Sequence, residues 1–285
     1  GCSIYRPYKR PDVAVVDSLY RRQISPADSA ASIADLSWKE LFTDPQLQKL
    51  IERGLRNNSD LGIARLRVKE AEALLKSARL SYLPSVNLSP QGTISKAEHG
   101  KTTKTYDLAA SASWEIDIFG KLTNAKREAR AVLEQSEAYR QAVQTQLIAT
   151  IANNYYTLLM LDEQLNISRR TAENWNENLR VMKALKRAGQ TTDMAVAQTE
   201  AGKLSVDASL LSLERQITEL ENTLSSLLGS ASGDITRSTL SGQSFPDTLL
   251  VGVPLQLLQR RPDVRQSEAA LAAAFYVTNR ARSAF

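Results

Sequence analysis

Cysteine, histidine and long apolar runs are what this 285-residue sequence has least of. Its single cysteine excludes a disulfide framework and a thiolate zinc site, and its single histidine leaves no imidazole pair for a metal ion. No uninterrupted apolar run approaches the ~20 residues that a membrane-spanning helix needs. Only 6% of the residues are aromatic, and 12 glycines and 9 prolines occur in all. This composition favours long helices over a loop-rich β fold.

The sequence also lacks a strong charge of one sign. Its 36 Lys and Arg against 31 Asp and Glu give a formal net charge of +5. A nucleic-acid-binding protein concentrates basic charge in one patch, so we expect no nucleic acid partner.

Signs of an enzyme are equally scarce. No glycine-rich phosphate loop follows a strand pattern, and His99 lies in a polar loop without a matched nucleophile. Glu115 and Asp117 could be mistaken for a catalytic carboxylate pair. They precede a predicted helix, however, and carboxylates near a helix N-terminus are stabilised by its dipole. We therefore expect no catalytic site, no metal and no cofactor.

The N-terminal residues suggest a lipid anchor. The sequence starts Gly1-Cys2-Ser3 without an initiator Met, and this start resembles the end of a bacterial lipoprotein signal, in which Cys2 would carry the lipid. A free thiol on a frayed terminus is the alternative. Residues 3–37 contain three prolines and no hydrophobic period, so residues 1–37 are predicted to form a lipid anchor and an extended tether.

The folded part is predicted to open with helices over residues 38–83, of which Pro45 begins one and Pro84 closes the last. The period then changes: from Tyr106 to Phe119 apolar side chains alternate with polar or small ones, and Val86, Leu88 and Ile94 do the same upstream. Residues 84–119 therefore predict a β-hairpin.

The two faces of this hairpin admit two interpretations. An ordinary half-buried hairpin is one, and a segment of a membrane barrel, with small polar residues lining the lumen, is the other. On the barrel interpretation, the side chains expected to face lipid are Tyr106, Leu108, Trp114, Ile116 and Ile118. Those expected to face the lumen are Asp107, Ser111, Ser113 and Glu115.

A very long helix is predicted next, because no Gly or Pro occurs from Lys121 to Ala188. At 1.5 Å per residue, such a helix would extend roughly 100 Å. Its apolar residues recur at heptad spacing, so it needs helical partners. Gly189 is expected to end it, and Thr192 or Asp193 to cap a returning helix over about 192–228. Residues 120–229 thus predict a long antiparallel helical pair.

The end of the sequence repeats its beginning weakly. Residues 230–253 are rich in Gly and Ser and predict a linker, after which a helix is expected from Pro254 through residue 285. At a spacing of 203 residues, Asp60 matches Asp263 and Ala71 matches Ala274. We therefore interpret 38–229 as a first repeat and 254–285 as the opening helix of a second, truncated one.

This order of elements resembles the TolC-type outer-membrane factors, particularly their lipid-anchored efflux branch, over nearly the whole chain. The matching segments are Trp38 to Leu61, Trp114 to Lys121, Gly189 to Asp193, and Gly252 to Val264, which contains Arg-Arg-Pro-Asp-Val. The resemblance implies a mainly α fold with a membrane β-hairpin. It also implies a homotrimer whose long helical pairs form an α-barrel tunnel topped by a shared β-barrel.

The resemblance further implies a function: a passive outer-membrane conduit of a tripartite efflux system, with a periplasmic helical portion. It would export drugs, metals or other toxic compounds, and a periplasmic adaptor and an inner-membrane pump would be its partners. The implied adaptor contact and gate is the turn Gly189, Gln190, Thr191, Thr192 and Asp193. A periplasmic adaptor and a coiled-coil scaffold lipoprotein are the alternatives. An adaptor would carry small all-β domains, which no pattern after residue 229 predicts.

Overall fold

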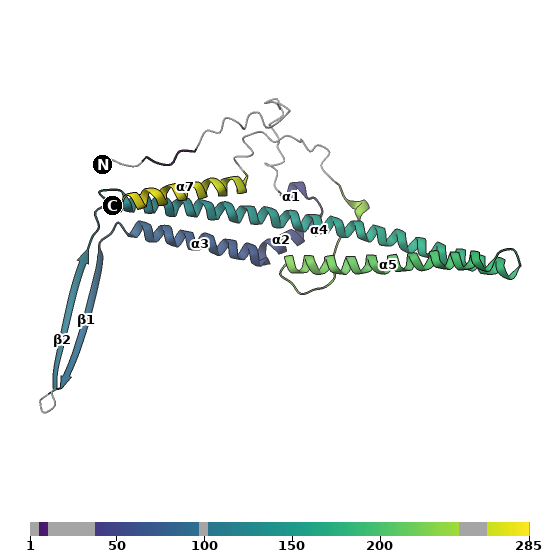
Figure 1. Cartoon of the computed structure of the whole chain (residues 1–285), viewed down its shortest axis with the longest axis horizontal. Coiled ribbons are helices and arrows are strands. Elements are labelled where there is room, and N and C mark those ends of the chain that lie inside the picture. Colours follow the sequence, from purple (N-terminus) through teal and green to yellow (C-terminus); the bar gives the residue numbers. More distant parts are fainter. Residues whose placement is uncertain (1–5, 11–37, 97–101, 245–260, 285) are drawn as a thin grey trace, which may run out of the picture. The chain divides into compact units, whose positions relative to one another are not determined.

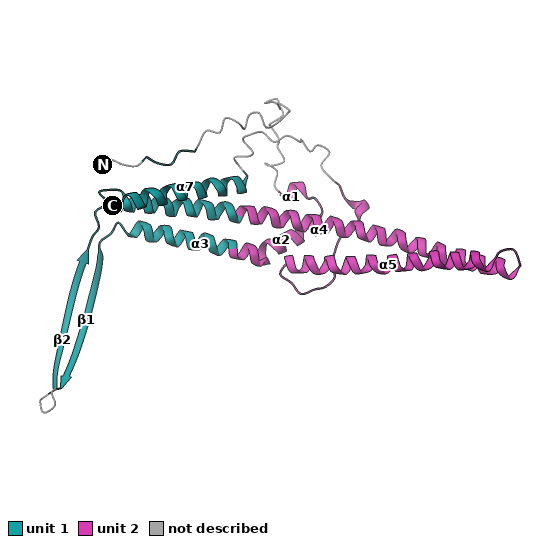
Figure 2. Cartoon of the chain, viewed as in Figure 1, with its two compact units in different colours: residues 1–19, 64–140, 259–285 teal, residues 20–63, 141–258 magenta. Residues whose placement is uncertain are grey.

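The computed structural model describes residues 6–10, 38–96, 102–244 and 261–284. Figure 1 shows the elements. In chain order they are α1 (Trp38–Leu41), α2 (Pro45–Asn57), α3 (Ser59–Leu80), β1 (Ser85–Lys96), β2 (Thr102–Ser113), α4 (Lys121–Arg187), α5 (Asp193–Leu227), the 3-10 turn η4 (Leu240–Gly242) and α7 (Pro262–Arg282). The helices divide between two compact units, and α3 and α4 each contribute to both (Figure 2).

One unit comprises residues 20–63 and 141–258 and holds a continuous hydrophobic core. Leu47 and Ile51 of α2, Tyr155 and Leu158 of α4, and Leu224 of α5 are fully buried in it. Gly54 permits this close packing, because an added Cβ would lie 2.5 Å from the Ile151 side chain. The apolar faces of the three helices therefore bury one another, as their heptad spacing predicts.

The other unit comprises residues 1–19, 64–140 and 259–285. Its buried helical positions are mostly alanines, which let neighbouring helices approach closely. They are Ala64 and Ala71 of α3, Ala131 and Ala138 of α4, and Ala269 and Ala273 of α7. Polar contacts join the same helices: Arg67 lies over the ring of Tyr139, and Arg280 pairs with Glu128 at 3.1 Å.

The helix boundaries follow local chemistry. Asp44 caps α2, with its side chain accepting from the Gln46 N–H at 2.8 Å, and Pro45 takes the first helical position. The unbroken α4 confirms the long helix expected from the absence of Gly and Pro.

The prediction of a helix from Pro254 is wrong at Arg261, which has an extended backbone. A residue that precedes a proline avoids the helical region, so α7 begins at Pro262; residues 254–260 lie outside the described part. This start falls 203 residues after that of α3 at Ser59, the same spacing as the sequence repeat.

Candidate functional site

The hairpin β1–β2 is a two-faced ribbon. The strands pair antiparallel in a register that places even-numbered residues opposite even-numbered ones. The even face carries Val86, Leu88, Pro90, Gly92 and Ile94 on β1, and Tyr106, Leu108, Ala110 and Ala112 on β2, with Lys96, Thr102 and Lys104 at the end away from the helices. The odd face carries Ser, Asn, Gln and Thr, with Ala109 and a single charged residue, Asp107. Every residue of both strands is exposed in the single chain, so the even face is an apolar surface without cover from the described residues.

The strand ends earlier than the sequence predicts. β2 stops at Ser113, so Trp114, Glu115, Ile116 and Ile118 lie beyond it, and their assignment to a strand is wrong. The reason is the partner: Ser113 pairs with Ser85, the first residue of β1, and the preceding Pro84 has no N–H with which to extend the ladder. Instead, the indole N–H of Trp114 donates to the Tyr82 carbonyl at 3.1 Å.

Asp117 fastens the hairpin base to α4. Its carboxylate accepts from the backbone N–H groups of Leu122 and Thr123, both at 2.8 Å, and from the Thr123 hydroxyl at 2.6 Å. Burial acts to raise the pKa of Asp117, but these hydrogen bonds outweigh it and the net pKa is lowered. Glu115 pairs with Lys121 at 2.8 Å. Both carboxylates thus serve the helix N-terminus, which is the structural role expected of them.

The α4–α5 turn is capped from both sides. Gly189 has φ +72°, and the Gln190 N–H donates to the Leu185 carbonyl at 2.9 Å, the pattern of a left-handed helix cap. The Thr192 hydroxyl accepts from the Ala195 N–H at 3.2 Å, so Thr192 is the N-cap of α5. Asp193 is exposed and pairs with Lys186 across the turn. Gly189 therefore ends α4 as predicted, while Gln190 and Thr192 leave their side chains exposed.

An exposed apolar seam begins beside this turn on α5. Its six positions alternate in steps of three and four: Met194, Ala197, Ala201, Leu204, Ala208 and Leu211. Met194, Leu204 and Leu211 are 79%, 60% and 68% exposed. A second stripe on the same helix, with Val196, Leu213 and Ile217, is already buried. Such a/d spacing on an uncovered face is typical of a helix that has a further helical partner.

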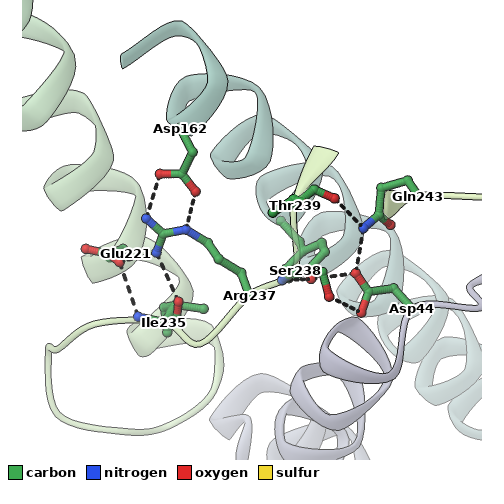
Figure 3. Close-up of polar contacts among 9 residues, drawn as sticks. Asp44, Asp162, Glu221, Ile235, Arg237, Ser238, Thr239 and Gln243 are labelled. Atoms are coloured by element: carbon green, nitrogen blue, oxygen red, sulfur yellow. Dashed lines mark hydrogen bonds and ion pairs between the residues drawn. The ribbon is translucent and has the colours of Figure 1, made fainter. Parts of the chain in front are cut away.

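The segment predicted to be a linker is attached to the helices over residues 230–244. Arg237 makes a two-pronged contact with Asp162 of α4, at 2.5 and 2.8 Å, and a second contact with Glu221 of α5 at 2.5 Å (Figure 3). Ile235 is buried, and its N–H donates to Glu221 at 3.2 Å. The pKa of Arg237 is raised by its hydrogen bonds to Asp162, which outweigh burial, and Glu221 adds to the effect. Arg237 therefore joins α4 and α5 while fully charged.

A second polar cluster lies beside it, around Asp44 (Figure 3). The carboxylate accepts from the Tyr155 hydroxyl at 2.6 Å, from Gln243 at 2.8 Å and from the Ser238 hydroxyl at 3.0 Å. Burial acts to raise the pKa of Asp44, but the hydrogen bonds, with that from Tyr155 foremost, lower it overall. Burial and the bond to Asp44 raise the pKa of Tyr155 to about 12. The pair therefore stays ionised at Asp44 and neutral at Tyr155 near pH 7.

Sequence reasoning missed both clusters. The available signal was Glu221, a carboxylate among the leucines of α5, which needs a cation or hydrogen-bond donors once it is buried. Cys2 and His99 lie outside the described residues. Within the described residues, no group of three or more His, Cys, Asp or Glu is placed to hold a metal ion. None of the described helices combines the length and apolarity needed to cross a membrane.

Comparison with known proteins identifies the family of the chain. The family of outer membrane efflux proteins matches residues 50–230. The chain belongs to this outer membrane efflux protein family. The resemblance to outer-membrane factors is thereby confirmed.

Similar individual proteins are also named as outer-membrane or efflux proteins. The chain is 31% identical to the probable outer membrane lipoprotein SilC of Salmonella typhimurium over 100% of its length. It is 32% identical to the pyoverdine export outer membrane protein OpmQ of Pseudomonas putida over 90% of its length, which is 58% of OpmQ. The cation efflux system protein CusC of Escherichia coli is 28% identical over the whole chain, and a crystal structure of CusC covers 100% of the chain with a TM-score of 0.80.

The chain is shorter than these proteins. It spans 63% of SilC, 63% of CusC and 64% of the CusC chain in the crystal. The chain therefore spans less than two thirds of the length of each of these relatives.

Proposed function

We propose that the chain is part of a passive outer-membrane conduit of a tripartite efflux system, which exports small molecules from the periplasm and performs no catalysis. The observation that carries this proposal is the two-faced hairpin in a chain of the efflux family. In the outer membrane the even face would contact lipid and the odd face would line an aqueous lumen. The reverse orientation would put Asp107 into hydrocarbon, which is costly for a charged side chain.

The uncovered seam on α5 supports assembly with further copies of the chain. Its three alanines and three larger apolar residues recur at heptad spacing, which suits close packing of helix against helix. We propose a homotrimer in which α4 and α5 of each copy contribute to a shared helical tunnel and the hairpins to a shared β-barrel. The start of α7 lies 203 residues after that of α3, which supports two repeats, of which 38–229 is the first and α7 opens the second.

The α4–α5 turn is the proposed contact with a periplasmic adaptor. It lies at the far end of α4 from the hairpin along the chain, and therefore at the end that would point toward an inner-membrane pump. The salt bridge between Lys186 and Asp193 is exposed and free to rearrange on contact with a partner or another copy. Because the relatives are named for cations and for pyoverdine, we propose that the pump, not this chain, selects the substrate.

Lipid attachment at Cys2 completes the proposal. The relative SilC is named a probable outer membrane lipoprotein. Mass spectrometry of the protein purified from membranes is expected to find acyl chains on Cys2. An unmodified thiol would remove the anchor and leave the hairpin as the proposed membrane attachment.

A pair of adjacent lysine substitutions tests the conduit. Leu108→Lys places a charge on the even face near the middle of β2, where it costs about 2–4 kcal/mol in a barrel. Asp107→Lys adds the same side chain one residue away, on the odd face. In cells that lack their own channel of this family, we expect Asp107→Lys to keep export of a toxic cation and Leu108→Lys to abolish it, with loss from the outer membrane fraction. Equal behaviour of the two variants would contradict the assignment of the faces.

A further inference from the structure

The even face of the hairpin ends in two lysines. Lys96 is the last residue of β1, and Lys104 lies near the start of β2. The register pairs Lys104 with Ile94 and Lys96 with Thr102, so the two lysines are diagonal neighbours on the same face. Diagonal neighbours lie about 7–8 Å apart, close enough for both side chains to reach one group.

Neither lysine has an ion-pair partner among the described residues of the two strands. Both are exposed, and neither forms an ion pair with any residue that the structure describes. The carboxylate nearest to Lys104 in β2 is Asp107, which lies on the odd face. The connecting residues 97–101 lie outside the described part, and their sequence adds one glutamate and one lysine. Two like charges at neighbouring positions repel each other, so an anion bound between them would be stabilised by both.

Their position along the strand identifies the kind of anion. From Val86 to Ile94, the apolar part of β1 extends about 27 Å at ~3.4 Å per residue. The apolar band of an outer-membrane barrel is about 25 Å tall, with strands tilted by ~35–45° and aromatic residues at its borders. At this tilt the stretch from Val86 to Ile94 covers roughly 20 Å of the height of the band, and Lys96 lies two residues beyond Ile94. Lys104 lies opposite Ile94, so the long side chains of both lysines extend from the border of the band toward the lipid headgroups, and Tyr106 lies next to Lys104 on the even face as a border aromatic.

We infer that Lys96 and Lys104 form a binding site for the phosphate of a lipid headgroup in the leaflet that faces the hairpin tip. This inference rests on the proposed function, because it requires the even face to lie in lipid. The hairpin base is continuous with α3 and α4, so the lysines occupy the leaflet away from the helices. The site ties the edge of the barrel to anionic lipid and fixes how deep the strands lie.

Lipid selectivity measured by electron paramagnetic resonance tests this inference. The protein, purified from membranes, is reconstituted in phosphatidylcholine bilayers with a trace of spin-labelled phosphatidic acid or spin-labelled phosphatidylcholine. The motionally restricted fraction of each label gives the relative association of the two lipids with the protein surface. We expect the protein to prefer phosphatidic acid.

The test variant is Lys96→Gln with Lys104→Gln, and the matched control is Lys69→Gln with Lys76→Gln, which removes two exposed lysines of α3. The preference for phosphatidic acid should fall by up to about fivefold for each lysine that reaches a phosphate, which corresponds to ~1 kcal/mol per lysine near an anionic surface. The control should keep the preference, and Lys96→Arg with Lys104→Arg should restore it.

Three outcomes are distinguishable. Loss of the preference in the test variant alone, with restricted phosphatidylcholine unchanged, supports the lipid site. Retention of the preference, or an equal loss in the α3 control, overturns the site and leaves the proposed conduit intact. If the unaltered protein restricts neither lipid, the hairpin does not lie in a bilayer, and both the conduit and the site are refuted.

Discussion

Arg237 holds the segment 230–244 against α4 and α5, and its removal should release that segment. In Arg237→Ala, Asp162 and Glu221 lose their common cation. The side chains of Arg237 and Glu221 are only 18% and 11% exposed, while that of Asp162 is 35% exposed. Removing one member of a fully buried ion pair costs about 3–5 kcal/mol, and an exposed pair contributes about 0.2–1 kcal/mol. We expect an intermediate cost, about 2–3 kcal/mol for local opening.

Amide hydrogen exchange measures this opening locally. The N–H of Ile235 donates to Glu221, and the N–H of Ser238 donates to the Tyr155 hydroxyl at 3.0 Å, so both report on attachment of the segment. At 1.36 kcal/mol per factor of ten, the expected cost accelerates their exchange roughly 30- to 150-fold. Arg237→Lys keeps the charge but loses the two parallel hydrogen bonds to Asp162. Its exchange rates at Ile235 and Ser238 should therefore lie between those of the unaltered chain and those of Arg237→Ala.

The control is Arg215→Ala on α5. Arg215 pairs with Glu219 at 2.8 Å, but both side chains are well over half exposed. Such a pair four residues apart contributes about 0.3–0.5 kcal/mol, or roughly a twofold change in exchange. Unchanged exchange at Ile235 and Ser238 in Arg237→Ala would refute the view that this ion pair attaches the segment.

Three further predictions concern the same fold. Tyr155→Phe removes a donor to Asp44 and an acceptor for the Ser238 N–H, so thermal unfolding should show a loss of about 1–3 kcal/mol; an unchanged melting temperature would contradict the network. The folded-state pKa values of Asp44 and Asp117 are lowered, so both carboxylates stabilise the fold at pH values above the usual Asp pKa of about 3.9. This stabilisation is lost as the pH falls through their folded-state pKa values. As the pH is lowered from 6, the melting temperature should therefore fall less steeply for Asp44→Asn than for the unaltered chain. An equal dependence of the melting temperature on pH in both proteins would contradict this prediction. Gly189→Val should destabilise the α4–α5 turn by about 1–2 kcal/mol and Gly189→Asn by less. The space around Gly189 is open, but its φ of +72° is unfavourable for residues with a side chain, least so for Asn. Equal melting temperatures of the two variants and the unaltered chain would show that position 189 does not require the left-handed conformation.

Much of this fold could be predicted from the sequence because its signals are local. The absence of Gly and Pro after Lys121, the Gly189 cap and the alternation around Leu108 each act through neighbouring residues. The end of β2 could not be predicted from the alternation, because Pro84, just before the partner strand β1, limits the pairing. The docking of 230–244 could not be predicted from its Gly- and Ser-rich composition either, because Arg237 is satisfied by residues 16 and 75 positions away. The same holds for the candidate site. The two faces of the hairpin could be predicted from the alternation of apolar and polar residues, but the proximity of Lys96 and Lys104 became visible only with the pairing register of the strands.

The central claim is that one face of the hairpin contacts lipid and the other contacts water. Spin labels at positions 108 and 111, introduced singly into the protein purified from outer membranes, measure this directly through collisions with oxygen and with a water-soluble nickel complex. The account predicts that the label at Leu108 is accessible to oxygen and shielded from nickel, and that the label at Ser111 is accessible to nickel. Nickel access at position 108 with oxygen access at position 111, or equal access at both, would contradict it.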